Sequence, residues 1–168
     1  KFIDPNLDLL QNRTSVHHWV IMRYAEILLS YAEAMNEAYG PTGNVGYRLN
    51  AVRASNQVRN RVGVEMPAVP TAISKEELRE KIRNERRGEL AFEDHRFWDV
   101  RRWMIAEQEG VMSGAMYGIK IYWINSSPQE FRYTPYLYEN RTFTKKMYLH
   151  PFSTNEVNKG YLIQNPGY

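Results

Sequence analysis

Acidic, basic and large aromatic side chains alternate between Arg83 and Trp103, and this segment is the part of the chain best equipped for chemistry. Glu85, Glu89 and Glu93 follow one another at intervals of four residues, close to one turn of an α-helix. Carboxylates that share a helix face are typical of two kinds of site. One is a dinuclear metal centre between helices, and the other is a pair of acids for hydrolysis.

The metal-binding pattern is incomplete. A dinuclear centre of this kind needs Glu-x-x-His pairs on neighbouring helices, and the residue three positions before His95 is Phe92. The chain also lacks the His-Glu-x-x-His sequence of many zinc proteases and the Gly-rich sequences that bind nucleotides. We therefore expect no metal ion and no other cofactor.

The arginines around these acids weaken the hydrolase interpretation. Arg83, Arg86 and Arg87 lie within one turn of Glu85 and Glu89. Nearby cations lower the pKa of a carboxyl group, whereas a general acid needs a raised pKa. The pattern therefore favours structural ion pairs, and no catalytic residues are predicted.

The same acids fall in register with an apolar helix face that begins with Leu78 and Ile82. The positions that follow at helical spacing are Glu85, Glu89, Phe92 and Arg96. Burying a charge costs free energy unless the charge is paired, so both glutamates should meet cations from another helix. The candidate partners are Arg53 and Arg23, because each projects from a helix that we expect to pack nearby.

Two helices are predicted before this segment. Apolar residues recur at helical spacing over residues 18–39, and Gly40-Pro41 supplies a stop. A second helix is expected over residues 45–62, ending at Gly63. The short loop between them favours an antiparallel helix pair over residues 18–62, as in helical-repeat units.

The charged helices are predicted over residues 74–107, and the C-terminal part follows over 111–168. Ser74 and Glu77 form a capping box at the start, and a bend is expected near residues 93–95. Residues 111–168 read as short strands, loops and a terminal helical turn. We predict a single domain over residues 1–168 that is mostly α, with a small β/loop-rich C-terminal portion.

Composition excludes several classes of function. The 168 residues carry a net charge of +3, with basic and acidic residues interleaved, so there is no basic stripe for nucleic acid. The absence of cysteine excludes disulfides, zinc-thiolate sites and a thiol nucleophile within this chain. No apolar run approaches the length of a membrane span. No signal peptide opens the chain, so we expect its first residue to be a mature N-terminus or the start of a fragment.

Aromatic residues make up 13% of the chain, including 12 Tyr and 4 Trp. Aromatic rings offer flat, partly wettable faces that suit carbohydrate binding and protein interfaces. The candidate ligand contacts are Tyr117, Tyr122, Trp123, Tyr136 and Tyr138. The alternative is that these side chains pack within the fold, as aromatic residues in strands commonly do.

Several sequence blocks together resemble the SusD/RagB family. They include the helix-pair sequences, the R-N-E-R-R-G-E-L-A-F-E-D-H-R-F-W-D-V-R-R-W block and the Q-N-P-G-Y ending. The segments that carry the resemblance are Arg23–Ala34, Leu49–Arg53, Arg83–Trp103, Tyr148–Phe152, Asn155–Asn158 and Gln164–Tyr168. They run in the family's order from about residue 20 to the end.

The resemblance implies a function and a place in the cell. Such proteins are non-enzymatic, substrate-binding lipoproteins on the extracellular face of the outer membrane in Bacteroidetes-type bacteria. They serve nutrient uptake and polysaccharide utilisation by passing glycans or peptides to a TonB-dependent, SusC-like transporter. They contain tetratricopeptide-like helix pairs and are several times longer than this chain, which resembles their C-terminal part. Membrane association would occur only through a lipid anchor on the missing N-terminal part.

Two other interpretations remain open from the residues themselves. An intracellular helical-repeat scaffold would bind another protein through the 18–62 helix pair. A carboxylate hydrolase would depend on Glu85 for turnover. The upstream reading frame distinguishes the nutrient-binding protein from the scaffold. A signal peptide ending in a lipidated Cys supports the nutrient-binding protein, and further repeats without a signal support the scaffold.

Overall fold

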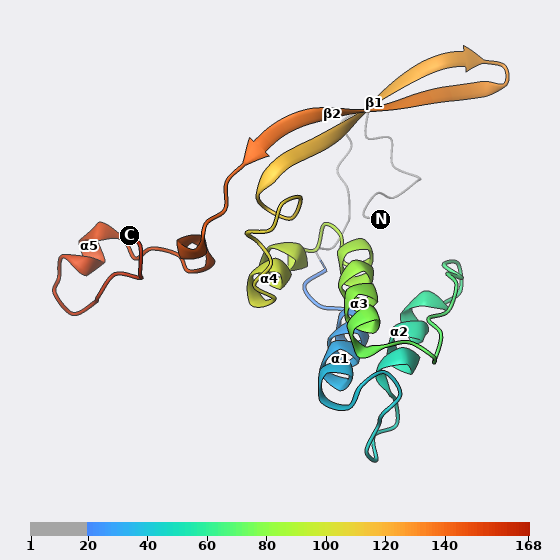
Figure 1. The fold of residues 1–168 in the computed structure, drawn as a ribbon, viewed down its shortest axis with the longest axis horizontal. Coiled ribbons are helices and arrows are strands. Elements are labelled where there is room, and N and C mark those ends of the chain that lie inside the picture. Colours follow the sequence, from blue (N-terminus) through green and yellow to red (C-terminus); the bar gives the residue numbers. More distant parts are fainter. Residues whose placement is uncertain (1–19) are drawn as a thin grey trace. The chain divides into compact units, whose positions relative to one another are not determined.

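The computed structural model describes residues 20–168, and helices dominate this part of the chain, with one two-stranded antiparallel sheet (Figure 1). The expected mostly α fold class is confirmed. Contacts divide the chain into two compact units, Lys1–Arg96 (the helical unit) and Phe97–Tyr168 (the C-terminal unit), and the single domain over residues 1–168 stays a prediction. The division has a physical basis, because each unit surrounds a buried apolar cluster of its own.

Three helices form the helical unit: α1 (Tyr24–Tyr39), α2 (Ala51–Arg59) and α3 (Lys75–Glu89). Figure 1 shows them side by side, and α1 contacts both of the others. Their largest buried cluster consists of Ala32, Met35, Ala51, Val52, Ala54, Val69, Leu78 and Ile82. The alanines on α1 and α2 have no side chain beyond Cβ, which lets the two backbones approach closely.

The first helix is shorter than predicted at its start. Residues 20–23 are not helical although they are described, and the expected start near residue 18 lies outside the described residues. Arg23 has an extended backbone, and the helix runs from Tyr24 to its cap at Gly40, whose φ of 74° is readily adopted by glycine. The buried face of α1 includes Leu29 and Asn36.

The prediction of a second helix over residues 45–62 is wrong at both ends. The Asn50 side chain caps α2 by accepting a hydrogen bond from the Arg53 backbone N–H at 2.8 Å. Before it, Val45 and Gly46 have positive φ values of 39° and 86°, which are incompatible with a right-handed helix. Turn chemistry in the flanking segments therefore overrides the apolar spacing.

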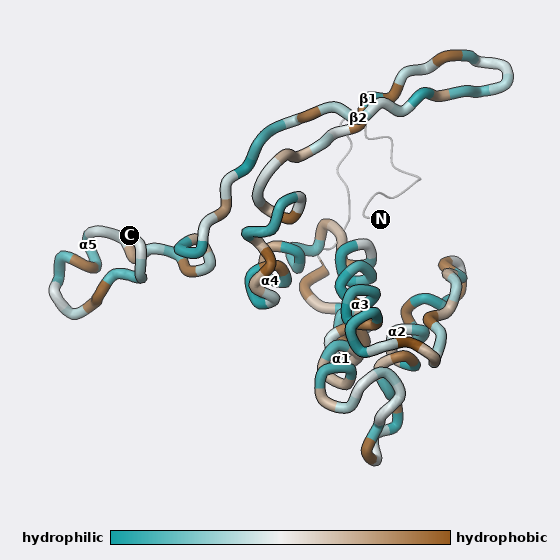
Figure 2. Tube along the Cα trace, in the orientation of Figure 1, coloured by the Kyte–Doolittle hydropathy of each residue, from teal (hydrophilic) through white to brown (hydrophobic). Residues whose placement is uncertain are grey.

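The start of α3 follows the predicted capping box. Ser74 Oγ accepts from the Glu77 backbone N–H at 3.2 Å, and Glu77 Oε2 accepts from the Ser74 backbone N–H at 3.0 Å. This helix is largely hydrophilic along its length (Figure 2). It ends at Glu89, and residues 90–94 form turns before α4 (His95–Arg102) begins. The break therefore starts earlier than the bend expected at residues 93–95.

Phe92 shows the consequence of that break. The predicted apolar face continued to Phe92, but its side chain is 83% exposed and its φ is 65°. Helical spacing cannot predict which side chains are buried beyond Leu90, because α3 is capped at that residue. The predicted second helix over residues 96–107 is likewise shortened to α4, and Met104 just beyond it has a φ of 54°.

The C-terminal unit has a small core of Val100, Ala106 and Phe143. Partly buried residues pack around it: Ile105, Val111, Met112, Met147 and Tyr148. A 3₁₀ helix (Lys145–Tyr148) and the short α5 (Thr154–Val157) follow the sheet. Ser153 caps α5 by accepting from the Glu156 backbone N–H at 3.4 Å, at the predicted terminal helical turn.

The sheet is a hairpin of β1 (Gly114–Ser126) and β2 (Gln129–Arg141), joined by Ser127-Pro128. Each strand has 13 residues, so the strands are much longer than expected. Pro135 lies within β2, because each strand of a two-stranded sheet has a free edge that tolerates a residue without an N–H group. None of the helices in residues 20–168 combines the length and apolar character needed to cross a bilayer.

Candidate ligand-binding surfaces

Glu89 is the centre of a carboxylate–arginine cluster in the helical unit, which consists of Arg23, Arg61, Glu89 and Glu93. Arg61 donates to both Glu89 carboxylate oxygens, at 2.5 and 2.7 Å. Arg23 Nη1 donates to Glu89 Oε1 at 2.6 Å, and its Nε donates to Glu93 Oε2 at 2.7 Å. The carboxylates are nearly enclosed, with side-chain exposures of 9% for Glu89 and 2% for Glu93. The cluster thus connects the start of α1, the residues after α2 and the end of α3.

The two predicted cross-helix partners have different positions. Arg23 is joined to Glu89 as described above. Glu85 pairs with Arg59, at the end of α2, whereas Arg53 is exposed on another face of that helix. Arg59 is further oriented by donating to the Pro67 carbonyl at 2.9 Å. Sequence spacing alone could not choose between arginines of α2, because the choice depends on how the helix is rotated about its axis.

The electrostatics of Glu89 suit an ion pair and oppose a role as a general acid. Burial raises the pKa of its carboxyl group, but the hydrogen bonds from Arg61 and Arg23 outweigh burial and hold the pKa below its ordinary value. A general acid needs the opposite shift. No group of acidic and histidine side chains in residues 20–168 is arranged to hold a metal ion.

Acid should destabilise the helical unit through Glu89. Its pKa is lower in the folded than in the unfolded chain, so the pair's contribution is fully present above the ordinary value of 4.5 and is lost as the pH falls through the lower folded value. We expect the melting temperature to decrease between about pH 5 and about pH 3, and to decrease less in Glu89→Gln. Thermal unfolding followed by circular dichroism measures both curves, and parallel curves would contradict this assignment.

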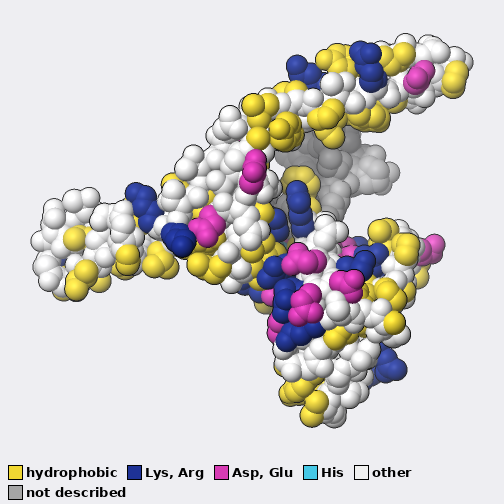
Figure 3. All heavy atoms as spheres, viewed as in Figure 1, with side chains coloured by type: hydrophobic (Ala, Val, Ile, Leu, Met, Phe, Trp, Pro, Cys, Tyr) yellow, Lys and Arg dark blue, Asp and Glu magenta, His cyan; other side chains and the backbone are white. Residues whose placement is uncertain are grey.

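The hairpin presents two chemically different faces. Residues directly opposite each other in an antiparallel pair point to the same side, and the side alternates along each strand. One face contains no charged or amide side chain between the two bulges: Tyr117, Ile119, Ile121, Trp123, Phe131, Tyr133, Pro135 and Leu137. Seven of these eight are large hydrophobics exposed by 39% or more, and Figure 3 shows hydrophobic side chains along the hairpin.

The opposite hairpin face mixes tyrosines with cations. Lys120 Nζ lies 4.8 Å from the centre of the Tyr136 ring, and the Arg132 guanidinium lies 5.2 Å from that of Tyr122. The Tyr136 ring also covers Gly118, where an added Cβ would lie 2.9 Å from a ring carbon. Gly118 therefore permits this close approach, and Tyr136 is the least exposed of the predicted ligand contacts.

The structure does not bring the five predicted ligand contacts together. Tyr117 and Trp123 lie on the apolar face, about 20 Å apart along β1 at the usual rise per residue. Tyr122 and Tyr136 lie on the other face, and Tyr138 occupies a bulge. Strand alternation thus separates residues that are neighbours in sequence, and the hairpin offers two extended surfaces in place of one pocket.

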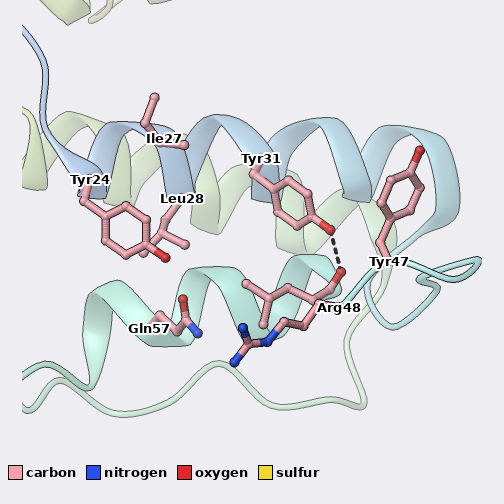
Figure 4. A pocket seen from close by; sticks show the side chains of 8 residues that line it. Tyr24, Ile27, Leu28, Tyr31, Tyr47, Arg48 and Gln57 are labelled. Atoms are coloured by element: carbon pink, nitrogen blue, oxygen red, sulfur yellow. Dashed lines mark hydrogen bonds between the residues drawn. The ribbon is translucent and has the colours of Figure 1, made fainter.

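Sequence reasoning missed a groove between α1 and α2, which we call the α1–α2 groove (Figure 4). It has a volume of about 440 Å³, and its lining residues are Tyr24, Ile27, Leu28, Tyr31, Tyr47, Arg48, Leu49 and Gln57. Tyr24 is 69% exposed although its spacing fits the apolar face of the first helix. The available signal was a second apolar row on α1, formed by Tyr24, Ile27 and Tyr31 at spacings of three and four residues.

The fold and these surfaces define a class: a mostly helical protein with exposed aromatic surfaces whose clustered carboxylates are held in ion pairs. Comparison with known proteins is consistent with this class. A family model described as the SusD family matches residues 1–168. The chain therefore belongs to the SusD family.

Similar proteins fall in the same family. SusD-like protein P2 of Formosa agariphila is 37% identical over 95 residues, which are 54% of this chain and 18% of that protein. SusD-like protein P38 of the same organism is 35% identical over 83 residues, 49% of this chain and 16% of that protein. The match thus spans less than a fifth of either relative.

The fold also resembles a solved structure. The crystal structure of a SusD-like carbohydrate binding protein from Bacteroides vulgatus superposes with a TM-score of 0.55 at 23% sequence identity. The likeness covers 83% of this chain and 28% of that one. At this identity the likeness establishes the fold.

Proposed function

We propose that this chain is part of a non-catalytic binding component of a surface nutrient-uptake system. The protein would capture a glycan or peptide on the extracellular face of the outer membrane and deliver it to a TonB-dependent, SusC-like transporter. The observation that carries the proposal is the match of the SusD family model to the whole chain. The fold likeness to a protein described as carbohydrate binding favours a glycan over a peptide.

The state of the carboxylates supports a binding role over hydrolysis. Glu85 and Glu89 accept hydrogen bonds from arginines of the segments beside them, and Glu93 accepts from Arg23. The pKa of the Glu89 carboxyl group lies below its ordinary value, whereas a general acid needs a raised pKa. We therefore expect no hydrolytic turnover, and Glu85→Gln should affect only the stability of the helical unit.

Exposed rings on the hairpin are the proposed ligand contacts, and Trp123 is the strongest candidate. Its side chain is 68% exposed, and its indole N–H donates to the Asn125 carbonyl at 2.6 Å, which orients the ring. A flat ring of fixed orientation suits the apolar face of a sugar. Tyr117, Tyr122, Tyr136 and Tyr138 are proposed as further contacts for an extended ligand that runs along a strand.

Trp123→Ala should weaken glycan binding roughly three- to tenfold, because an aromatic contact contributes about 0.5–1.5 kcal/mol. Affinity electrophoresis in gels containing starch, xylan, pectin or carrageenan measures the retardation of the full chain. The matched control is Trp98→Ala, since Trp98 is 61% exposed and lies on α4 away from the hairpin strands. Equal retardation of Trp123→Ala and the original chain would remove Trp123 from the site.

A further inference from the structure

We propose that the α1–α2 groove, with two hollows that adjoin it, binds an anionic oligosaccharide whose sugars carry carboxylate or sulfate groups. The proposal rests on the glycan-binding function above and assigns a second ligand surface, on the helical unit. It follows from the charges, the exposed rings and the rigidity of this part of the helical unit.

Three hollows meet at Gln57, which lines all of them. Beside the groove itself, one hollow of about 480 Å³ is lined by residues that include Arg23, Tyr24 and Arg61. The other, of about 400 Å³, is lined by residues that include Arg53. The three hollows are neighbours because they share lining residues, and we call them together the trough.

Every charged side chain that lines this trough is an arginine. Arg23, Arg48, Arg53 and Arg61 line its three parts, and none of the described lining residues is acidic. Arg23 and Arg61 are already joined to Glu89 and Glu93, so their charge is largely balanced. Arg48 and Arg53 are exposed to solvent and supply the excess positive charge. This charge favours an anionic ligand over a neutral one.

The position of Arg48 suits an oxyanion such as a carboxylate or a sulfate. Figure 4 shows its side chain extending along the groove toward Gln57. A guanidinium donates two parallel hydrogen bonds to a carboxylate or sulfate, and an amide beside it can donate to or accept from a hydroxyl. Together they provide the two kinds of polar contact that an acidic sugar requires.

Tyrosine rings supply the apolar part of the groove. Tyr24 and Tyr47 are 69% and 53% exposed, while Leu28, which also lines the groove, is buried. Tyr31 is fixed by a hydrogen bond from its hydroxyl to the Leu49 carbonyl at 2.8 Å (Figure 4). Rings held in place before binding lose little conformational entropy when a sugar stacks on them.

These features favour a sugar over a helix of another protein. A docking helix buries a continuous row of aliphatic side chains in a hydrophobic groove. Here Ile27 is the one aliphatic side chain of the groove that is strongly exposed, and the remaining accessible surface consists mainly of rings, a guanidinium and an amide. Acidic peptides share the charge of the proposed ligand, so they form a separate arm of the test.

The test compares retardation of the full chain in gels containing polygalacturonate, carrageenan, or a neutral polysaccharide such as xylan. We expect retardation by polygalacturonate or carrageenan and a loss of about tenfold in affinity for Arg48→Ala, from one charge-assisted contact. The matched control is Arg87→Ala, which removes the same charge from an exposed position of α3 outside the trough. The two acidic gels distinguish a carboxylate ligand from a sulfate ligand.

Each outcome bears on the proposal. Retardation by xylan alone would overturn the anionic ligand while leaving the proposed glycan-binding function intact, and retardation by no polysaccharide would overturn both. Equal losses for Arg48→Ala and Arg87→Ala would show nonspecific charge attraction and reject the groove. Binding of poly-glutamate that depends on Arg48, without binding of the acidic glycans, would reassign the trough to a protein partner.

Discussion

Glu89→Gln should lower the free energy of unfolding of the helical unit by about 3 kcal/mol. Glu89 accepts hydrogen bonds from Arg23 and Arg61, and its own carboxylate is 9% exposed. The amide keeps the shape of the side chain but removes the charge, so two guanidinium groups remain together without their shared anion. The expected loss lies at the low end of the range for buried pairs, because Arg61 is 40% exposed.

Urea unfolding followed by circular dichroism at the helix band measures this loss. The matched control is Glu37→Gln, which breaks an ion pair with Arg79 whose carboxylate is 41% exposed. Water already screens that pair, so its loss should be about 1 kcal/mol or less. An unchanged stability for Glu89→Gln, or equal losses for the two variants, would contradict the structural role of the carboxylate–arginine cluster.

Leu78→Ala should destabilise the helical unit by about 2–5 kcal/mol. The Leu78 side chain is fully buried between α3 and residues of α1 and α2, in the cluster that includes Val52 and Met35. Truncation removes buried apolar surface and leaves a cavity that the neighbouring helices cannot entirely fill. The same urea experiment reports the loss.

Phe92→Ala is the control for this second prediction. Both residues belong to the apolar face expected from helical spacing, but Phe92 is 83% exposed. Its truncation should change the stability of the full chain by no more than about 0.5 kcal/mol. If Phe92→Ala destabilised the chain as much as Leu78→Ala, the turns after α3 would have to be packed against the core.

Local rules predicted the parts of the fold where they act alone. The capping box of Ser74 and Glu77 depends on two residues three positions apart, and it forms as expected. The buried positions Leu78 and Ile82 follow from helical spacing in the middle of α3. These features need only one helix and one apolar neighbour, so the sequence carries enough information for them.

Predictions failed where a helix ends or where partners lie far apart in sequence. The limits of α2 depend on the Asn50 cap and on positive φ values before it, which apolar spacing does not encode. The partner of Glu85 is Arg59 because of the rotation of α2 against α3. The hairpin is longer than predicted, and β2 accommodates Pro135 because the strand has a free edge.

The candidate binding surfaces were likewise predicted only in part, by residue type and not by spatial arrangement. The aromatic residues of the hairpin were recognised by type, but their distribution over two faces follows from the register of the strands. The α1–α2 groove combines residues from α1, α2 and the segment between them. Its members are spread over residues 24–57 and come together only when the two helices pack.

The sequence by itself determined the family, the mostly helical class and the presence of paired carboxylates, because each is encoded in residue types and short spacings. Tertiary structure alone decided which arginine meets which glutamate, which hairpin rings share a face, and that Tyr24, Arg48 and Gln57 line one groove. The physical reason is that these relations depend on the rotation and register of whole elements. Many contacts acting together set that rotation and register, and no short segment of the chain contains them.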